Sequence, residues 1–196
     1  MKEERNFVSG IVPPAERSEP AWWFAFQENK LLVYQKSSSI SIPCLVDFVE
    51  LGLTVLDQHY LGRLNNTHCY AVELGEGTVP PAGMTFEGLR QVYGRLDEVL
   101  FWVAARAVQI VDWDRTHLFC GRCGAPLRTK TTERAKECPK CGQLHFPRLA
   151  FRKSHDPIDL FHHPNGPFDP QLDGFCCLLV DQTEFSLEAI QSFPGL

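Results

Sequence analysis

Four cysteines in two closely spaced pairs constrain this chain more than any other feature of its sequence. The pairs are Cys120 with Cys123 and Cys138 with Cys141, so the pattern is C-x2-C-x14-C-x2-C. Each pair can present two thiolates to one metal from a single tight turn, and two such turns complete a tetrahedral site. Redox-active or disulfide-forming cysteines are the alternative, which this spacing disfavours. We therefore expect one structural Zn²⁺ on these sulphurs, supplying folding free energy that so small a segment cannot obtain from a core.

Length and composition allow one domain and a small second module. The chain has 196 residues, 44% of them hydrophobic, and a formal net charge of −5. No apolar run reaches the length of about 18 residues that predicts a membrane span. Residues 1–10 are charged and lack the apolar centre of a secretory signal. We expect a cytoplasmic protein with no membrane partner.

The other cysteines support a reducing compartment. They lie in apolar surroundings, where a free cysteine behaves as a small buried apolar residue. We expect that of Cys44, Cys69, Cys176 and Cys177.

The first half of the chain reads as β-rich after a loosely ordered lead-in at residues 1–19. Aromatic and β-branched residues at 21–26 and 31–34 flank a polar turn at Glu28-Asn29, which predicts a hairpin. Further strands are expected over residues 46–56, 60–62 and 68–74, the last two on either side of Asn65-Asn66. Residues 75–83 form a connector.

Helices are predicted between this half and the cysteines. A short helix is expected over residues 85–93. A longer one follows, with Asp97 as its N-cap, and runs to about Trp113. Its apolar residues recur at helical spacing: Val99, Leu100, Val103, Ala107, Val108, Ile110 and Val111. The sequence therefore predicts an α+β fold, a mixed sheet with helices, followed by the four-cysteine module.

The cysteine-containing segment is locally basic. Residues 120–155 carry nine Lys and Arg against two Glu, whereas the rest of the chain carries 10 basic and 22 acidic residues. One interpretation is a face that binds nucleotide phosphates or RNA. The other is a solvated surface that offsets the negative charge of a zinc tetrathiolate. We favour the second because no aromatic residues alternate with the basic ones, so RNA is not an expected partner.

Residues 150–196 are predicted to be an irregular tail. Turn signals follow one another closely between residues 156 and 170. His162 and His163 stand beside a proline in a polar loop, which is more typical of solvent-exposed residues than of metal ligands. Residues 175–180 are apolar enough for one strand.

Several short motifs together resemble the NAD(H) diphosphatases (NADH pyrophosphatases) of the Nudix superfamily. They span residues 20–149 and include the entry to the first cysteine pair and the aromatic-Pro exit from the second. The matching residues are Trp22-Trp23, Arg90-Gln91-Val92, the run from Arg115 to Gly124, Glu133, and Phe146-Pro147-Arg148.

The resemblance implies a domain order. Residues 20–117 correspond to a rudimentary Nudix-like N-terminal domain and residues 118–149 to a zinc ribbon. In the family a catalytic Nudix domain follows, and the enzymes are homodimers. They hydrolyse NAD(H) to nicotinamide mononucleotide and AMP with Mg²⁺ or Mn²⁺, and some remove NAD caps from RNA.

The resemblance also implies substrate contacts at Arg90, Glu133 and Phe146. The family usually has Tyr at the last position, so a hydroxyl contact would be lost here. The ordinary interpretations are a surface arginine, a surface glutamate and a core phenylalanine.

One departure from the family changes the functional expectation. The Nudix box, G-x5-E-x7-R-E-x2-E-E-x-G, holds the catalytic divalent ions on clustered carboxylates, and no such string occurs in these residues. No Mg²⁺ or Mn²⁺ site is therefore found, and no catalytic residue is assigned. Residues 150–196 are interpreted as a native tail, a truncated or frame-shifted product, or an alternative form. Two hypotheses stay open: part of an NAD(H) diphosphatase that is inactive in this form, and a non-catalytic zinc-ribbon binding or dimerisation module.

Overall fold

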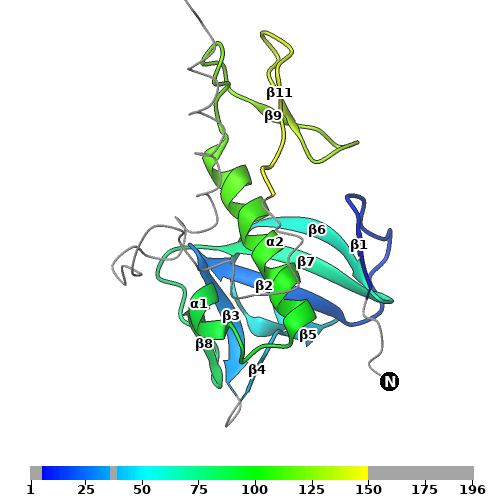
Figure 1. The fold of residues 1–196 in the computed structure, drawn as a ribbon, viewed down its shortest axis with the longest axis vertical. Helices are drawn as coiled ribbons and strands as arrows, with labels where there is room; N and C mark the ends of the chain where they lie inside the picture. The colour runs from blue at the N-terminus through cyan, green and yellow to red at the C-terminus, as the bar shows by residue number, and fades with distance from the viewer. Residues whose placement is uncertain (1–5, 36–38, 150–196) are drawn as a thin grey trace, which may run out of the picture. The chain divides into compact units, whose positions relative to one another are not determined.

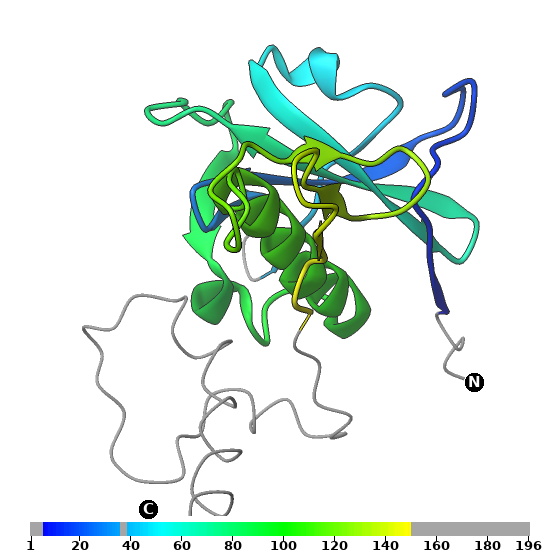
Figure 2. The same cartoon turned by 90° about the horizontal axis from the view of Figure 1, so that it is seen from above.

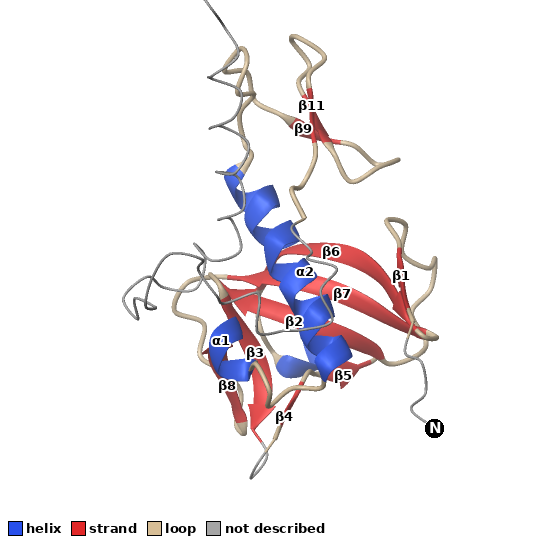
Figure 3. Ribbon diagram, viewed as in Figure 1, coloured by secondary structure: helices blue, strands red, loops and turns tan. Residues whose placement is uncertain are grey.

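A computed structural model of the chain describes residues 6–35 and 39–149. Strands dominate this part, and one long helix stands between the first eight strands and the last three (Figures 1 and 3). The strands are β1 (Phe7–Ser9), β2 (Ala21–Gln27), β3 (Lys30–Gln35), β4 (Ile40–Ser41), β5 (Cys44–Leu45), β6 (Val55–Leu64), β7 (Thr67–Leu74), β8 (Met84–Gly88), β9 (Arg128–Thr129), β10 (Lys136–Glu137) and β11 (Leu144–His145). The helices are the 3-10 helix η1 (Phe48–Leu51) and the α-helices α1 (Leu89–Val92) and α2 (Glu98–Thr116).

The first eight strands form one mixed sheet. Its main path runs β1-β6-β7-β2-β3-β4, while β5 pairs with β2 and β8 pairs with β3. Only the pairing of β2 with β7 is parallel, and it joins Trp22 to Cys69 at one end and Gln27 to Leu74 at the other. The two predicted hairpins, β2–β3 and β6–β7, are confirmed, and Glu28 and Asn65 adopt positive φ at their turns.

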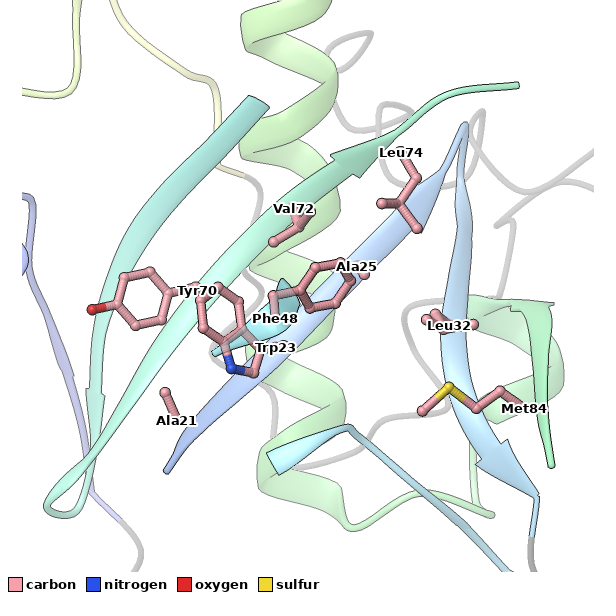
Figure 4. Close-up of a cluster of buried hydrophobic side chains, with 9 residues drawn as sticks. All are labelled: Ala21, Trp23, Ala25, Leu32, Phe48, Tyr70, Val72, Leu74 and Met84. Carbon is pink, nitrogen blue, oxygen red and sulfur yellow. The ribbon is translucent and has the colours of Figure 1, made fainter. Parts of the chain in front are cut away.

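An aromatic cluster fills one side of this sheet. Trp23 is fully buried and stacks on Tyr70 at a ring-centroid distance of 4.7 Å. Phe48 from η1 lies beside the Trp23 ring (Figure 4), and the two ring centroids are 5.5 Å apart. The indole N–H of Trp23 donates to the Leu45 carbonyl over 3.0 Å, so the buried polar atom is satisfied.

The predicted long helix is confirmed as α2, which packs against β2, β6 and β7 and crosses the sheet in Figure 2. Its N-cap is Asp97, whose carboxylate accepts hydrogen bonds from the amides of Val99 and Leu100. Most of the apolar positions that predicted the helix are buried, and Val103 is only 3% exposed. No helix among residues 6–35 and 39–149 is long and apolar enough to cross a membrane.

Three local predictions differ from the structure. The lead-in contains β1, which pairs with β6. The segment predicted as a strand over 46–56 contains η1 (Phe48–Leu51), where Asp47 and Glu50 form a capping box, and becomes a strand only where β6 begins at Val55. The segment predicted as a helix over 85–93 is helical only at α1 (Leu89–Val92), because its first residues belong to β8, where pairing with β3 overrides the local preference.

The four-cysteine module contains a small three-stranded sheet in the order β11-β10-β9. Mixed main sheet, helices and this module together confirm the α+β class. The predicted tail with its histidines, Cys176, Cys177 and the strand at 175–180 lies outside the described residues. Cys69 is buried as expected, but Cys44 is exposed because it lies on the short strand β5, so that prediction is wrong for Cys44.

Candidate functional site

The sulphurs of Cys120, Cys123, Cys138 and Cys141 converge, each lying within 4.8 Å of the others. The two contacts that cross between the pairs are 3.6 Å for Cys120–Cys141 and 3.4 Å for Cys123–Cys138. A tetrahedral Zn²⁺ with bonds of about 2.3 Å would hold its sulphurs about 3.8 Å apart. The arrangement therefore fits a zinc tetrathiolate with little adjustment.

The two turns that carry the cysteines repeat one hydrogen-bond pattern. The amides of Gly124 and Gly142 donate to the carbonyls of Cys120 and Cys138 over 2.8 and 2.9 Å. Both glycines adopt positive φ, 70° and 72°, the conformation that glycine tolerates best. The sequence therefore folds locally into two equivalent turns that face each other.

Lowered pKa values favour the thiolate form of Cys120 and Cys138. Burial raises the pKa of Cys120, but hydrogen bonds from His145 and the Arg122 backbone outweigh it and lower that pKa to about 7. Burial likewise raises the pKa of Cys138, and hydrogen bonds from the Cys141 backbone and the Cys123 side chain lower it to about 6.

The pKa of the Cys141 thiol is shifted in the opposite direction. A backbone hydrogen bond from Gln143 lowers the pKa of Cys141, but burial and the neighbouring sulphurs raise it to about 12. A divalent cation is the group that would hold all four as thiolates.

Two basic side chains attach the four-cysteine module to the preceding domain. The Arg134 guanidinium donates to the carbonyls of Gly10 over 2.9 Å and Tyr60 over 2.6 Å. The Lys136 ammonium donates to the Asp114 carbonyl and lies 3.0 Å from its carboxylate. Lys136 is 5% exposed and also lies 5.4 Å from the centre of the Trp113 ring.

A cavity of about 320 Å³ lies where these parts meet. Its walls come from residues 11–13, from 58–60 on β6, from 113–114 at the end of α2, and from 129–131 and 133–135 of the four-cysteine module. This volume is at the lower end of the range for small-molecule sites. Both donors and acceptors line it, so it can take a polar ligand.

His59, beside this cavity, belongs to an ion-pair network. Burial lowers its pKa, and the nearby carboxylates of Asp57 and Asp114 only partly oppose that shift. The ligand atoms of these three residues lie within 4.8 Å of one another. Because Lys136 already neutralises Asp114, the cluster does not resemble a second metal centre.

The structure places the predicted substrate residues Arg90 and Glu133 on different parts of the fold. Glu133 lines the cavity, and its carboxylate pairs with Lys130 at 2.7 Å. Arg90 lies on α1, which packs near the start of α2 through the Tyr93–Phe101 ring contact. A helix of 19 residues is about 28 Å long, so Arg90 and Glu133 lie near opposite ends of α2. Phe146 is 53% exposed, which excludes the interpretation as a core residue.

Sequence reasoning missed Arg134, Lys136 and His59 as structural participants. The first two were counted in the basic run and assigned to a solvated surface, which is wrong because both contact the preceding domain. Arg134 lies before β10 and Lys136 at its start, so strand alternation does not connect them, and their partners Gly10, Tyr60 and Asp114 come from other segments of the chain.

Family comparisons match both parts of this structure. Residues 20–113 match the NADH pyrophosphatase-like rudimentary NUDIX domain, and residues 115–146 match the NADH pyrophosphatase zinc ribbon domain. The chain belongs to the NADH pyrophosphatase family, of which it carries these two domains.

Similar proteins include three bacterial enzymes, each described as the NAD-capped RNA hydrolase NudC. The chain is 39% identical to the protein from Deinococcus radiodurans over 146 residues, which are 74% of this chain and 48% of that protein. The chain is 38% identical to the Stutzerimonas stutzeri protein over 100 residues, which are 51% of this chain and 36% of that protein. The chain is 35% identical to a protein from Pseudomonas fluorescens over 98 residues, which are 50% of this chain and 35% of that protein. The chain therefore spans about half of the first relative and about a third of the other two.

Proposed function

We propose that this chain is the nucleotide-binding and scaffolding part of an NAD(H) diphosphatase, and that these 196 residues alone do not hydrolyse NADH. Its ribbon holds one Zn²⁺ on Cys120, Cys123, Cys138 and Cys141. That ion has a structural role, since four thiolates fill a tetrahedral coordination sphere.

The observation that carries this proposal is the pair of consecutive matches to two domains of one family, over residues 20–113 and 115–146. The cavity that contains Glu133 lies between those two domains and supports a role in ligand binding. The position of Arg90 near the far end of α2 favours binding at two places, or by two copies of the chain, over one pocket per chain.

NADH binding to the zinc-loaded chain tests this proposal by titration calorimetry. We expect weak, saturable binding that Arg90→Ala and Glu133→Gln each weaken by roughly tenfold, the effect of losing one charged contact. Arg128→Ala is the matched control, because Arg128 is an exposed arginine of β9 outside the cavity. Absence of binding, or equal binding by all variants, would contradict the proposal.

Phe146→Tyr provides a gain-of-function test. If Phe146 stands where the family has a tyrosine hydroxyl contact, restoring that hydroxyl should tighten NADH binding by about fivefold, the effect of one hydrogen bond. Unchanged affinity would remove Phe146 from the substrate site.

The alternative function is a non-catalytic dimerisation or binding module. A homodimer in the cytoplasm fits both functions, and the free thiols of Cys44 and Cys69 are in keeping with a reducing compartment. Light scattering on the zinc-loaded chain tests the dimer. RNA remains a disfavoured partner, because Arg134 and Lys136 of the basic run are used inside the fold.

A further inference from the structure

The N-terminal arm, defined as residues 6–13, forms one wall of the cavity. Its strand β1 pairs with β6, and the Gly10 amide donates to the Leu61 carbonyl over 3.0 Å. This crossing requires glycine at position 62, because a Cβ there would meet the Val8 carbonyl oxygen at 2.1 Å. Beyond Gly10 the arm continues along the cavity through residues 11–13.

Arg134 joins this arm to the ribbon and to the main sheet at one point. A single guanidinium nitrogen donates both to Gly10 of the arm and to Tyr60 of β6. Burial lowers the pKa of Arg134, so its charge is partly withdrawn from water and the two carbonyls replace solvent. Arg134 therefore ties the arm at Gly10 to the ribbon, in addition to the β1–β6 pairing and the Arg106–Ser9 hydrogen bond, which hold the first residues of the arm.

Arg134 and Lys136 are placed by the same segment that supplies the ligand Cys138. Lys136 begins β10, the central strand of the ribbon sheet, and Cys138 follows that strand directly. Within residues 118–149, the buried residues are Cys120, Ala135, Lys136 and Cys138. A module with so few buried apolar side chains depends on its metal for a fixed conformation.

We propose that zinc binding at the four cysteines and anchoring of the N-terminal arm are one coupled equilibrium. With the metal bound, the segment that leads into β10 holds Arg134 on Gly10 and Tyr60, and the arm completes the cavity. Loss of the metal releases Arg134, frees the arm and opens the cavity, while the main sheet stays folded. Zinc thus regulates access to the cavity that contains Glu133. That this cavity is a ligand site rests on the function proposed above.

Hydrogen exchange measured by mass spectrometry tests the coupling. The zinc-loaded chain is compared with the same chain after chelation, with metal content measured in both. We expect exchange in the arm to become roughly ten- to hundredfold faster on chelation, as for a segment that loses a charged hydrogen bond. Amides of β2 and β7 serve as the internal reference and should keep their protection.

Arg134→Met removes the hydrogen bonds of Arg134 to Gly10 and Tyr60 and leaves the metal ligands unchanged. This variant keeps all four cysteines, so it should retain about one zinc per chain, yet its arm should exchange as fast as in the chelated wild type. Arg128→Met is the matched control, because Arg128 is an exposed arginine of the same ribbon, and its arm should stay protected.

Three outcomes would overturn the proposal. The first is an arm that stays protected after the metal has left, and the second is an arm unaffected by Arg134→Met. The third is loss of protection in β2 and β7 together with the arm, because the metal would then stabilise the whole domain. None of these measurements uses a nucleotide, so the coupling can hold or fail independently of NADH binding.

Discussion

Cys123 occupies the first of the two equivalent turns, and its sulphur lies 3.4 Å from that of Cys138 in the second. A serine hydroxyl is a poor zinc ligand, so Cys123→Ser should reduce the zinc content well below about one per chain and unfold residues 118–148 locally. Atomic absorption and hydrogen exchange measure the two effects. Cys44→Ser is the control, because Cys44 is a free, exposed cysteine outside the cluster. Full zinc occupancy in Cys123→Ser would refute the ligand assignment.

His59 connects pH to stability through its buried ring. Its pKa is lowered from 6.5 because burial disfavours the imidazolium, an effect that Asp57 and Asp114 only partly oppose and that Arg134 and Lys136 reinforce. The unfolded chain therefore takes up this proton first, and stability present above pH 6.5 is lost as the pH falls towards the lower folded value.

His59→Gln should make the free energy of unfolding less dependent on pH between about 7.5 and 5. Urea titrations at matched zinc content compare the variant with the wild type, so that protonation of the cysteines affects both equally. Parallel pH dependences would show that His59 does not titrate differently in the two states.

Single residues also show how far sequence reasoning can reach. The cysteine ligands were predictable because their signal is a spacing within one short segment. The hydrogen bond of Arg134 to the N-terminal arm was not predictable. Its partner Gly10 stands 124 positions away and contributes a backbone carbonyl that any residue type could supply. Glu133 and Phe146 were proposed from family resemblance alone.

At the level of elements, α2 links the two domains and covers the sheet. Val103 on its buried face is 3% exposed, so Val103→Asp places an unpaired charge against β-sheet and should destabilise the domain by about 3 kcal/mol or more. Val99→Asp is the matched control, because it makes the same change in the first turn, where a negative charge is favoured. Thermal unfolding measures both, and equal melting temperatures for Val103→Asp and the wild type would place that face in solvent.

The elements that were predicted correctly have local signals. Asp97 caps α2 and turn residues join β2 to β3, so sequence neighbours determine both. The strands β1 and β8 were missed because each depends on a distant partner: Phe7 pairs with Leu64, and Lys30 with Gly88. The three residues of β1 are too few to show a strand pattern in the sequence, and pairing with β6 makes them a strand.

At the level of the whole molecule, we propose that the chain binds and scaffolds without hydrolysing NADH. Hydrolysis of a pyrophosphate needs metal ions on clustered carboxylates to neutralise charge and activate water. The Nudix string that provides them does not occur in these 196 residues, and the ribbon zinc has no open position on four thiolates. Glu184 and Glu188 share helical spacing but have no accompanying Arg-Glu string, and both lie outside the described residues.

Release of AMP from NADH by the purified, zinc-loaded chain tests this claim most directly. The assay is chromatographic, with Mg²⁺ or Mn²⁺ added and a protein-free reaction as the baseline. We expect no metal-dependent AMP above that baseline, even at NADH concentrations that saturate binding. Metal-dependent turnover that Glu184→Gln abolishes would contradict it and would locate a catalytic carboxylate in residues 150–196.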